Sequence, residues 1–161
     1  MKRSVTDADA RPAPTPPTAG EPSRDRPRGP GRRLVGSIRT VAVLALFCTL
    51  LQAAFAGLFV TGDVGMLDLH GMNAGLVILM TLAQTVNAVL LWRGNRSLKW
   101  PMAAGLVMIV MVGAQQMMGD QRIIAWHILL GTALVGVKTA MLCWAFTLRP
   151  VPAAPVAEVA R

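Results

Sequence analysis

The chain has 161 residues, of which 53% are hydrophobic and only 15% are charged, with a mean hydropathy of +0.50. A soluble domain of this length would expose more charge, so the composition indicates a membrane protein that forms one compact unit. Sixteen Lys and Arg residues outnumber eight Asp and Glu residues, but nine of these cations lie within the first 39 residues. The positive excess therefore reports membrane topology, and we expect no nucleic-acid partner.

The N-terminal region is rich in proline and in charges of both signs. Residues 1–33 contain seven of the eleven prolines. Such a composition cannot bury enough apolar surface to offset the entropy of ordering, so we expect residues 1–37 to be a disordered cytoplasmic tail. A short second tail is expected at residues 149–161.

Four long stretches that are almost free of charge follow this region. They run over residues 40–62, 69–92, 100–119 and 123–148, and the single charge within them is Lys138. Twenty helical residues cover about 30 Å, the thickness of the bilayer hydrocarbon core. The sequence thus predicts an all-α fold, an integral membrane up-down four-helix bundle over residues 38–148. The expected spans are about 38–62, 67–92, 100–119 and 122–148.

The charges of the loops predict the orientation of these spans. The second loop holds Arg93, Arg96 and Lys99, whereas the first and third loops together hold three aspartates and one cation. By the positive-inside rule both termini are cytoplasmic, and we expect a multi-pass protein of the cytoplasmic (inner) membrane. Besides the lipid bilayer, the expected partners are a membrane redox protein or further copies of this chain.

His70 and His127 are the two histidines of the chain, and each lies near the start of its span. The second and fourth spans run in the same direction, so the two imidazoles lie at nearly the same depth. These two helices are diagonal in an up-down bundle, so inward-facing histidines would face each other. Such a pair can ligate the iron of a non-covalent haem. Alternatively, each histidine is a packing residue that donates to a carbonyl.

The segments Leu69-His70-Gly71 and Trp126-His127-Ile128 resemble, in topology and histidine placement, one four-helix half of haem A synthase. The resemblance covers residues 38–148 and implies that His70 and His127 are axial ligands of a haem. No glutamate lies near His70 and the outer loop has no cysteine pair, so the resemblance does not extend to oxidation of a haem methyl group. Residues 52–59 and 67–70 also resemble small uncharacterised four-span bacterial membrane proteins.

A haem held by these histidines would be b-type, because the chain contains no C-x-x-C-H motif. Arg122, near the outer surface, is expected to pair with a haem propionate. Electron transfer, or service to a membrane oxidoreductase, is the function expected of such a protein. No catalytic acid, base or nucleophile stands out, so the sequence does not decide whether the chain is an enzyme.

Lys138 is a cation about ten residues from either end of its span. It shares a helix face with His127, and we expect it to face the bundle interior near Thr81 and Gln84. Asn73 falls on the inward face of the second span, beside His70. A proton relay and an anion site are the functional interpretations of Lys138, and a lysine that snorkels to the membrane surface is the alternative.

Four methionines, Met66, Met72, Met117 and Met118, are expected at a depth close to that of the histidines, and Met66, Met117 and Met118 are the candidate copper ligands. Thioethers together with imidazoles suit Cu(I), so a copper-handling or small transport protein is an alternative to a haem protein. Methionine is also a common flexible packing residue. A third class, a non-catalytic membrane protein that acts through its partners, also stays open.

Overall fold

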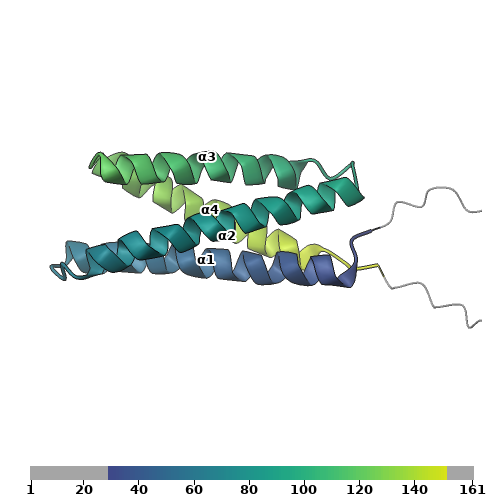
Figure 1. The fold of residues 1–161 in the computed structure, drawn as a ribbon, viewed down its shortest axis with the longest axis horizontal. Helices are drawn as coiled ribbons and strands as arrows, with labels where there is room; N and C mark the ends of the chain where they lie inside the picture. The colour runs from purple at the N-terminus through teal and green to yellow at the C-terminus, as the bar shows by residue number, and fades with distance from the viewer. Residues whose placement is uncertain (1–28, 152–161) are drawn as a thin grey trace, which may run out of the picture.

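The computed structural model describes residues 29–151, which form four α-helices without a strand (Figure 1). The helices are α1 (Arg32–Val60), α2 (Met66–Gly94), α3 (Trp100–Asp120) and α4 (Ile124–Thr147). Each of the four is long and apolar enough to cross a membrane. The predicted all-α fold with four long apolar helices is therefore confirmed, and the helices indicate a multi-pass membrane protein in contact with lipid.

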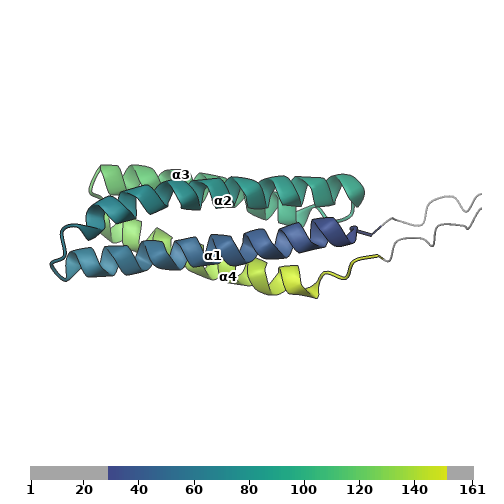
Figure 2. The ribbon, with the colours of Figure 1, turned by 60° about the horizontal axis from the view of Figure 1, so that its bottom comes forward.

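The four helices run alternately up and down and are joined by short turns. α1 packs against α2 and α4, and α3 packs against the same two helices, so α2 and α4 lie diagonally across the bundle (Figures 1 and 2). Arg32 and Thr147 lie at one end, which we call the terminal end. The opposite end carries the α1–α2 and α3–α4 turns and is called the histidine end, because His70 and His127 are near it.

The start of α1 differs most from the boundaries expected from the sequence, and the other helix ends, including the start of α4, agree to within two residues. α1 begins at Arg32, so residues 32–37 are helical although the predicted tail extended to residue 37. The helix starts early because Val35, 2% exposed, is already packed against the other helices. α4 begins at Ile124 rather than at residue 122, because Arg122 lies in a turn with a φ of 57°. The predicted disorder of residues 1–28 and 152–161 falls outside the described residues.

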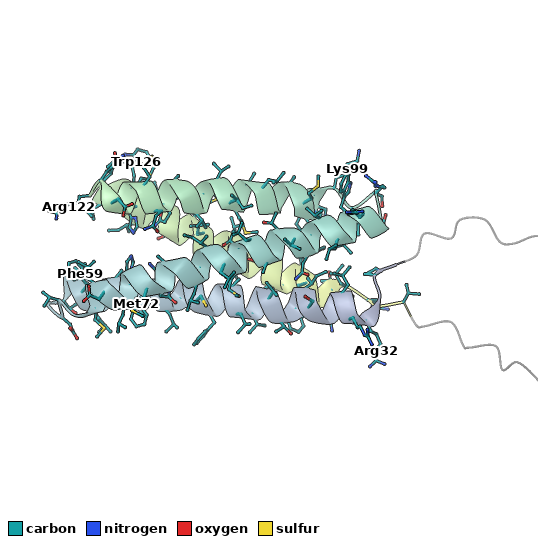
Figure 3. The ribbon with its side chains drawn as sticks, viewed as in Figure 1. Arg32, Phe59, Met72, Lys99, Arg122 and Trp126 are labelled. Carbon is teal, nitrogen blue, oxygen red and sulfur yellow. The ribbon has the colours of Figure 1, made fainter. Side chains whose placement is uncertain are left out.

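The distribution of polar and apolar side chains is inverted relative to a soluble protein. Large apolar residues such as Phe47, Val110 and Leu129 are more than half exposed, and Met72 and Trp126 project outward in Figure 3. Exposed apolar residues occur along all four helices. So much exposed apolar surface is rare on soluble monomers and is expected on a surface that faces lipid. The buried residues include seven polar ones, namely Thr49, Asn73, Thr81, Gln84, Thr85, Asn87 and Lys138.

At the terminal end, the side chain of Arg39 holds α1 against the end of α4. Its guanidinium donates to the carbonyl oxygens of Ala145 and Leu148, at 3.3 Å and 2.8 Å, and lies over the ring of Phe146. The last four carbonyls of a helix have no partner within the helix, so Arg39 supplies partners that α4 itself lacks.

Candidate functional site

A cavity of about 390 Å³ lies inside the histidine end of the bundle, between all four helices. Cavities that take small molecules and cofactors have volumes of about 300–1,000 Å³ and walls that are mostly apolar. The walls here include Ala56, Phe59, Val77 and Leu134. The polar residues of the lining are Gln52, His70, Gln115, Gln116, Asp120 and His127. The cavity thus has the size and character of a cofactor site.

His70 of α2 and His127 of α4 face each other in this cavity. Their ring centroids are 6.1 Å apart and their planes are inclined by 51°. Two imidazoles on opposite sides of one metal ion, with metal–nitrogen bonds of about 2 Å and about 1.2 Å from each nitrogen to its ring centre, have centroids about 6 Å apart. The observed separation therefore suits a single metal ion between the two rings.

Each imidazole donates one hydrogen bond to a backbone carbonyl of a neighbouring helix. Nδ1 of His70 lies 3.0 Å from the carbonyl oxygen of Gln52, and Nδ1 of His127 lies 2.9 Å from that of Gln115. A carbonyl only accepts, so the proton of each neutral ring is on Nδ1 and the lone pair is on Nε2. Histidines that ligate metals are held in the same way, because this bond fixes both tautomer and ring orientation.

The side chain of Gln52 strengthens the support of His70. Its Nε2 donates to the carbonyl oxygen of His70 at 2.9 Å, and its Oε1 accepts from Nδ2 of Asn73 at 2.6 Å. Asn73 also donates to the carbonyl oxygen of Cys48 at 2.8 Å. The inward position expected for Asn73 is thus the one observed, and Asn73 positions Gln52 rather than reaching the cavity itself.

Two glycines allow the side chains around His127 to approach the backbone closely. A Cβ atom at Gly119 would lie 3.0 Å from Cε1 of His127, and one at Gly131 would lie 3.0 Å from Nε2 of Gln115. Sequence reasoning missed the roles of Gly119 and Gln52. Every residue has a backbone carbonyl, so the sequence does not show which carbonyl accepts from a histidine. The close approach of the His127 ring to Gly119 depends on how the helices pack, which the sequence does not show either.

Other residues predicted for the site lie outside the cavity. Arg122 is exposed in the α3–α4 turn and lies at the tip of the histidine end in Figure 3. Met66, Met117 and Met118 are not among the residues that line the cavity, and Met117 is 50% exposed. Within residues 29–151 there is also no group of three or more His, Cys, Asp or Glu arranged to hold a metal ion. The structure therefore brings the two histidines together without these methionines.

Lys138 lies toward the middle of the bundle, on the side of the cavity that faces the terminal end. It is 0% exposed, and its Nζ donates to Oγ1 of Thr81 at 2.8 Å. Gln84 is one helical turn farther along α2 and is also buried. The side chain of Lys138 is thus directed into the bundle and does not snorkel to the membrane surface.

A scan against models of protein families and searches of curated proteins and of solved structures found no match. The function is therefore inferred from the residues of the site alone. Their main features are the paired imidazoles, the two carbonyls that orient them and the apolar cavity around them.

Proposed function

We propose that this protein binds one b-type haem non-covalently between His70 and His127, and that it transfers electrons to or from a membrane oxidoreductase. The observation that carries the proposal is the 6.1 Å separation of two imidazoles, each with its Nδ1 proton bonded to a carbonyl. A bound haem supplies reversible one-electron chemistry. His70 and His127 would both serve to hold the iron, which favours electron transfer over substrate oxidation.

The volume and the mostly apolar lining of the cavity support the proposal, because a haem macrocycle is flat and apolar. Gly71, Ala74 and Gly119 line the cavity near the histidines and, having small side chains or none, leave space there. Apolar residues such as Val77 and Leu134 line its inner end and would exclude water. Arg122 is on the same end of the bundle, and its long side chain is proposed to pair with a propionate at the surface. The roles of the protein are thus to hold the iron, to orient the imidazoles and to keep the site dry.

The proposed setting is the cytoplasmic membrane, with the terminal end inside. Arg93 at the end of α2, and Arg96 and Lys99 of the α2–α3 turn, lie at the terminal end together with Arg39. The charged residues near the histidine end are three aspartates and Arg122, so negative charge predominates there. The positive-inside rule then orients the haem toward the outer half of the membrane. A redox partner would approach the haem from that side.

Absorption spectroscopy of the purified, untagged full chain tests this proposal. Titration with haemin is expected to give one equivalent of low-spin haem with a sharp Soret band. His70→Ala and His127→Ala are each expected to abolish the low-spin spectrum, because each removes one axial ligand. Met117→Leu, an exposed change at the same end of the bundle, is the control and should leave the spectrum unchanged.

Two outcomes would contradict the proposal. One is a parent protein that binds no haemin, and the other is a low-spin spectrum that survives both histidine substitutions. Copper content measured on the same preparations separates the alternative site, since a Cu(I) site with thioether ligands would lose metal when Met66 or Met117 is replaced by leucine.

A further inference from the structure

A second buried polar site is centred on Lys138. Its Nζ donates to Oγ1 of Thr81, whose own hydroxyl donates to the carbonyl oxygen of Val77 at 2.7 Å. An ammonium group has three N–H donors, and this is the one hydrogen bond that Nζ of Lys138 makes within residues 29–151. A buried ammonium with unfilled donors is strongly disfavoured, so the site requires water or the loss of a proton.

A small cavity lies one helical turn from Lys138, toward the terminal end. It has a volume of about 20 Å³, and its lining includes Gln84, Asn87 and Met141. A cavity of about 10–15 Å³ is large enough for one water molecule. Gln84 is 6% exposed, and its buried Oε1 has no partner among the described residues. The unpartnered amide oxygen in a space of this size marks a water site.

Polar side chains continue from this cavity to the surface of the terminal end. Asn87 is one turn beyond Gln84 on α2, and its Oδ1 accepts a hydrogen bond from Oγ of Ser37 at 3.1 Å. Ser37 is exposed near the start of α1. Water that enters beside Ser37 and Asn87 would therefore find polar partners as far as Gln84.

The opposite direction is closed by apolar side chains. Val77, Val112 and Leu134 form a buried cluster between Lys138 and the histidine cavity, and each is at most 7% exposed. Val77 and Leu134 each precede their polar neighbours, Thr81 and Lys138, by one turn. This cluster offers no side-chain hydrogen-bond partner to water.

We propose that Lys138 is a proton-exchange site connected to the terminal end of the bundle and closed toward the histidine end. In the exchange, the ammonium gives one proton to the water beside Gln84, forming hydronium and a neutral amine, and the reverse step restores the ammonium. The four charge-poor stretches contain no carboxylate, so no counter-ion holds the proton on Lys138. Among residues 29–151, the titratable group that acts on Lys138 is Cys48 of α1. This proposal does not depend on a haem.

Nuclear magnetic resonance of the lysine side chain in lipid nanodiscs tests the proposal. The chain contains three lysines, Lys2, Lys99 and Lys138, so Lys2→Arg with Lys99→Arg leaves a single ¹⁵N-labelled Nζ. We expect the hydrogens of this Nζ to exchange with water much faster than the backbone amides of the surrounding helix. Gln84→Leu should slow the exchange about tenfold, because the water loses a hydrogen-bond partner.

Val112→Ile is the matched control, since it enlarges the apolar cluster on the other side of Lys138. It should leave the exchange rate unchanged. The proposal is overturned if Nζ exchanges no faster than the backbone amides, or if Val112→Ile slows the exchange while Gln84→Leu does not. Should Gln84→Leu fail to fold, the comparison of Nζ with the backbone amides in the parent protein still decides the question.

Discussion

At the scale of single residues, the histidine pair depends on groups that do not themselves touch a ligand. The carbonyls of Gln52 and Gln115 fix the two rings, and Gly119 provides the space that the ring of His127 occupies. These supports determine where each Nε2 points. Substitutions in them should therefore change the site without removing a proposed ligand.

Gly119→Ala tests the space around His127. The added Cβ would lie 3.0 Å from Cε1, so the ring must move, and overpacking of this kind costs about 1–3 kcal/mol. We expect weaker haemin binding and a lower melting temperature, measured by absorption and by thermal unfolding in detergent. Gly113→Ala on the same helix meets nothing within 4 Å and is the control. Equal behaviour of the two variants would show that His127 does not need this glycine.

Thr81→Val tests the hydrogen bond of Lys138. Valine has nearly the same shape but cannot accept, so the buried ammonium loses its partner at a cost of about 1–3 kcal/mol in the free energy of unfolding. Lys138→Met should be neutral or stabilising, because it removes the unfilled donors altogether. Unfolding in mixed detergent micelles measures both, with the exposed Thr139→Val as control. A Thr81→Val protein as stable as the Thr139→Val control would contradict this account.

The sequence predicted part of this chemistry. Charge-free length and helical periodicity gave a common depth for His70 and His127 and an inward face for Lys138. They could not give the 6.1 Å ring separation or the partner of Nδ1. Both depend on how the four helices pack. Moreover, every residue type has a backbone carbonyl, so the sequence does not show which one accepts from Nδ1.

At the scale of helices, the length of each apolar stretch determines that a helix forms. Contacts of individual side chains with neighbouring helices determine where that helix begins and ends. The sequence correctly predicts four long apolar helices, but it predicts that the first begins at residue 38, whereas α1 begins at Arg32. The difference arises because the arginines at residues 32 and 33 are typical of a tail. A long arginine side chain can nevertheless lie on the surface of a helix, while Val35 on the same turn is buried. Charge alone therefore does not mark the end of a helix at the membrane surface.

Arg39→Met tests how the end of α4 is held. The variant keeps the apolar stem but removes the donors to Ala145 and Leu148, for an expected loss of about 1–2 kcal/mol in the free energy of unfolding. Hydrogen exchange should become faster at the terminal end of α4 alone. Arg33→Met, an exposed change on the same helix, should leave this exchange as it is. Faster exchange along all four helices would instead indicate a general loss of packing.

At the scale of the whole molecule, the bundle consists of two similar helical hairpins. In α1–α2 and in α3–α4, a glutamine carbonyl of the first helix accepts from a histidine near the start of the second. The sequence shows this repeat only as a histidine near the start of the second and of the fourth span. The packing of the hairpins places equivalent residues on the two sides of one cavity.

The orientation of the bundle in the membrane is tested by reporter fusions. Fusions at Arg96 should report the cytoplasm, and fusions at Gly65 and Gln121 should report the outer side, because the cations gather in the α2–α3 turn. A signal from the outer side at Arg96 would reverse the orientation. The proposed haem site would then face the cytoplasm.

The central claim is that His70 and His127 hold one haem iron together, and labelling histidine alone tests it most directly. These are the two histidines of the chain, so ¹⁵N-histidine labels no other residue of the untagged protein. Electron–nuclear double resonance of the ferric, haemin-loaded protein is expected to show two axial ¹⁵N ligands, and His127→Ala should remove the low-spin signal. A spectrum with one labelled axial ligand, or with none, would contradict the claim.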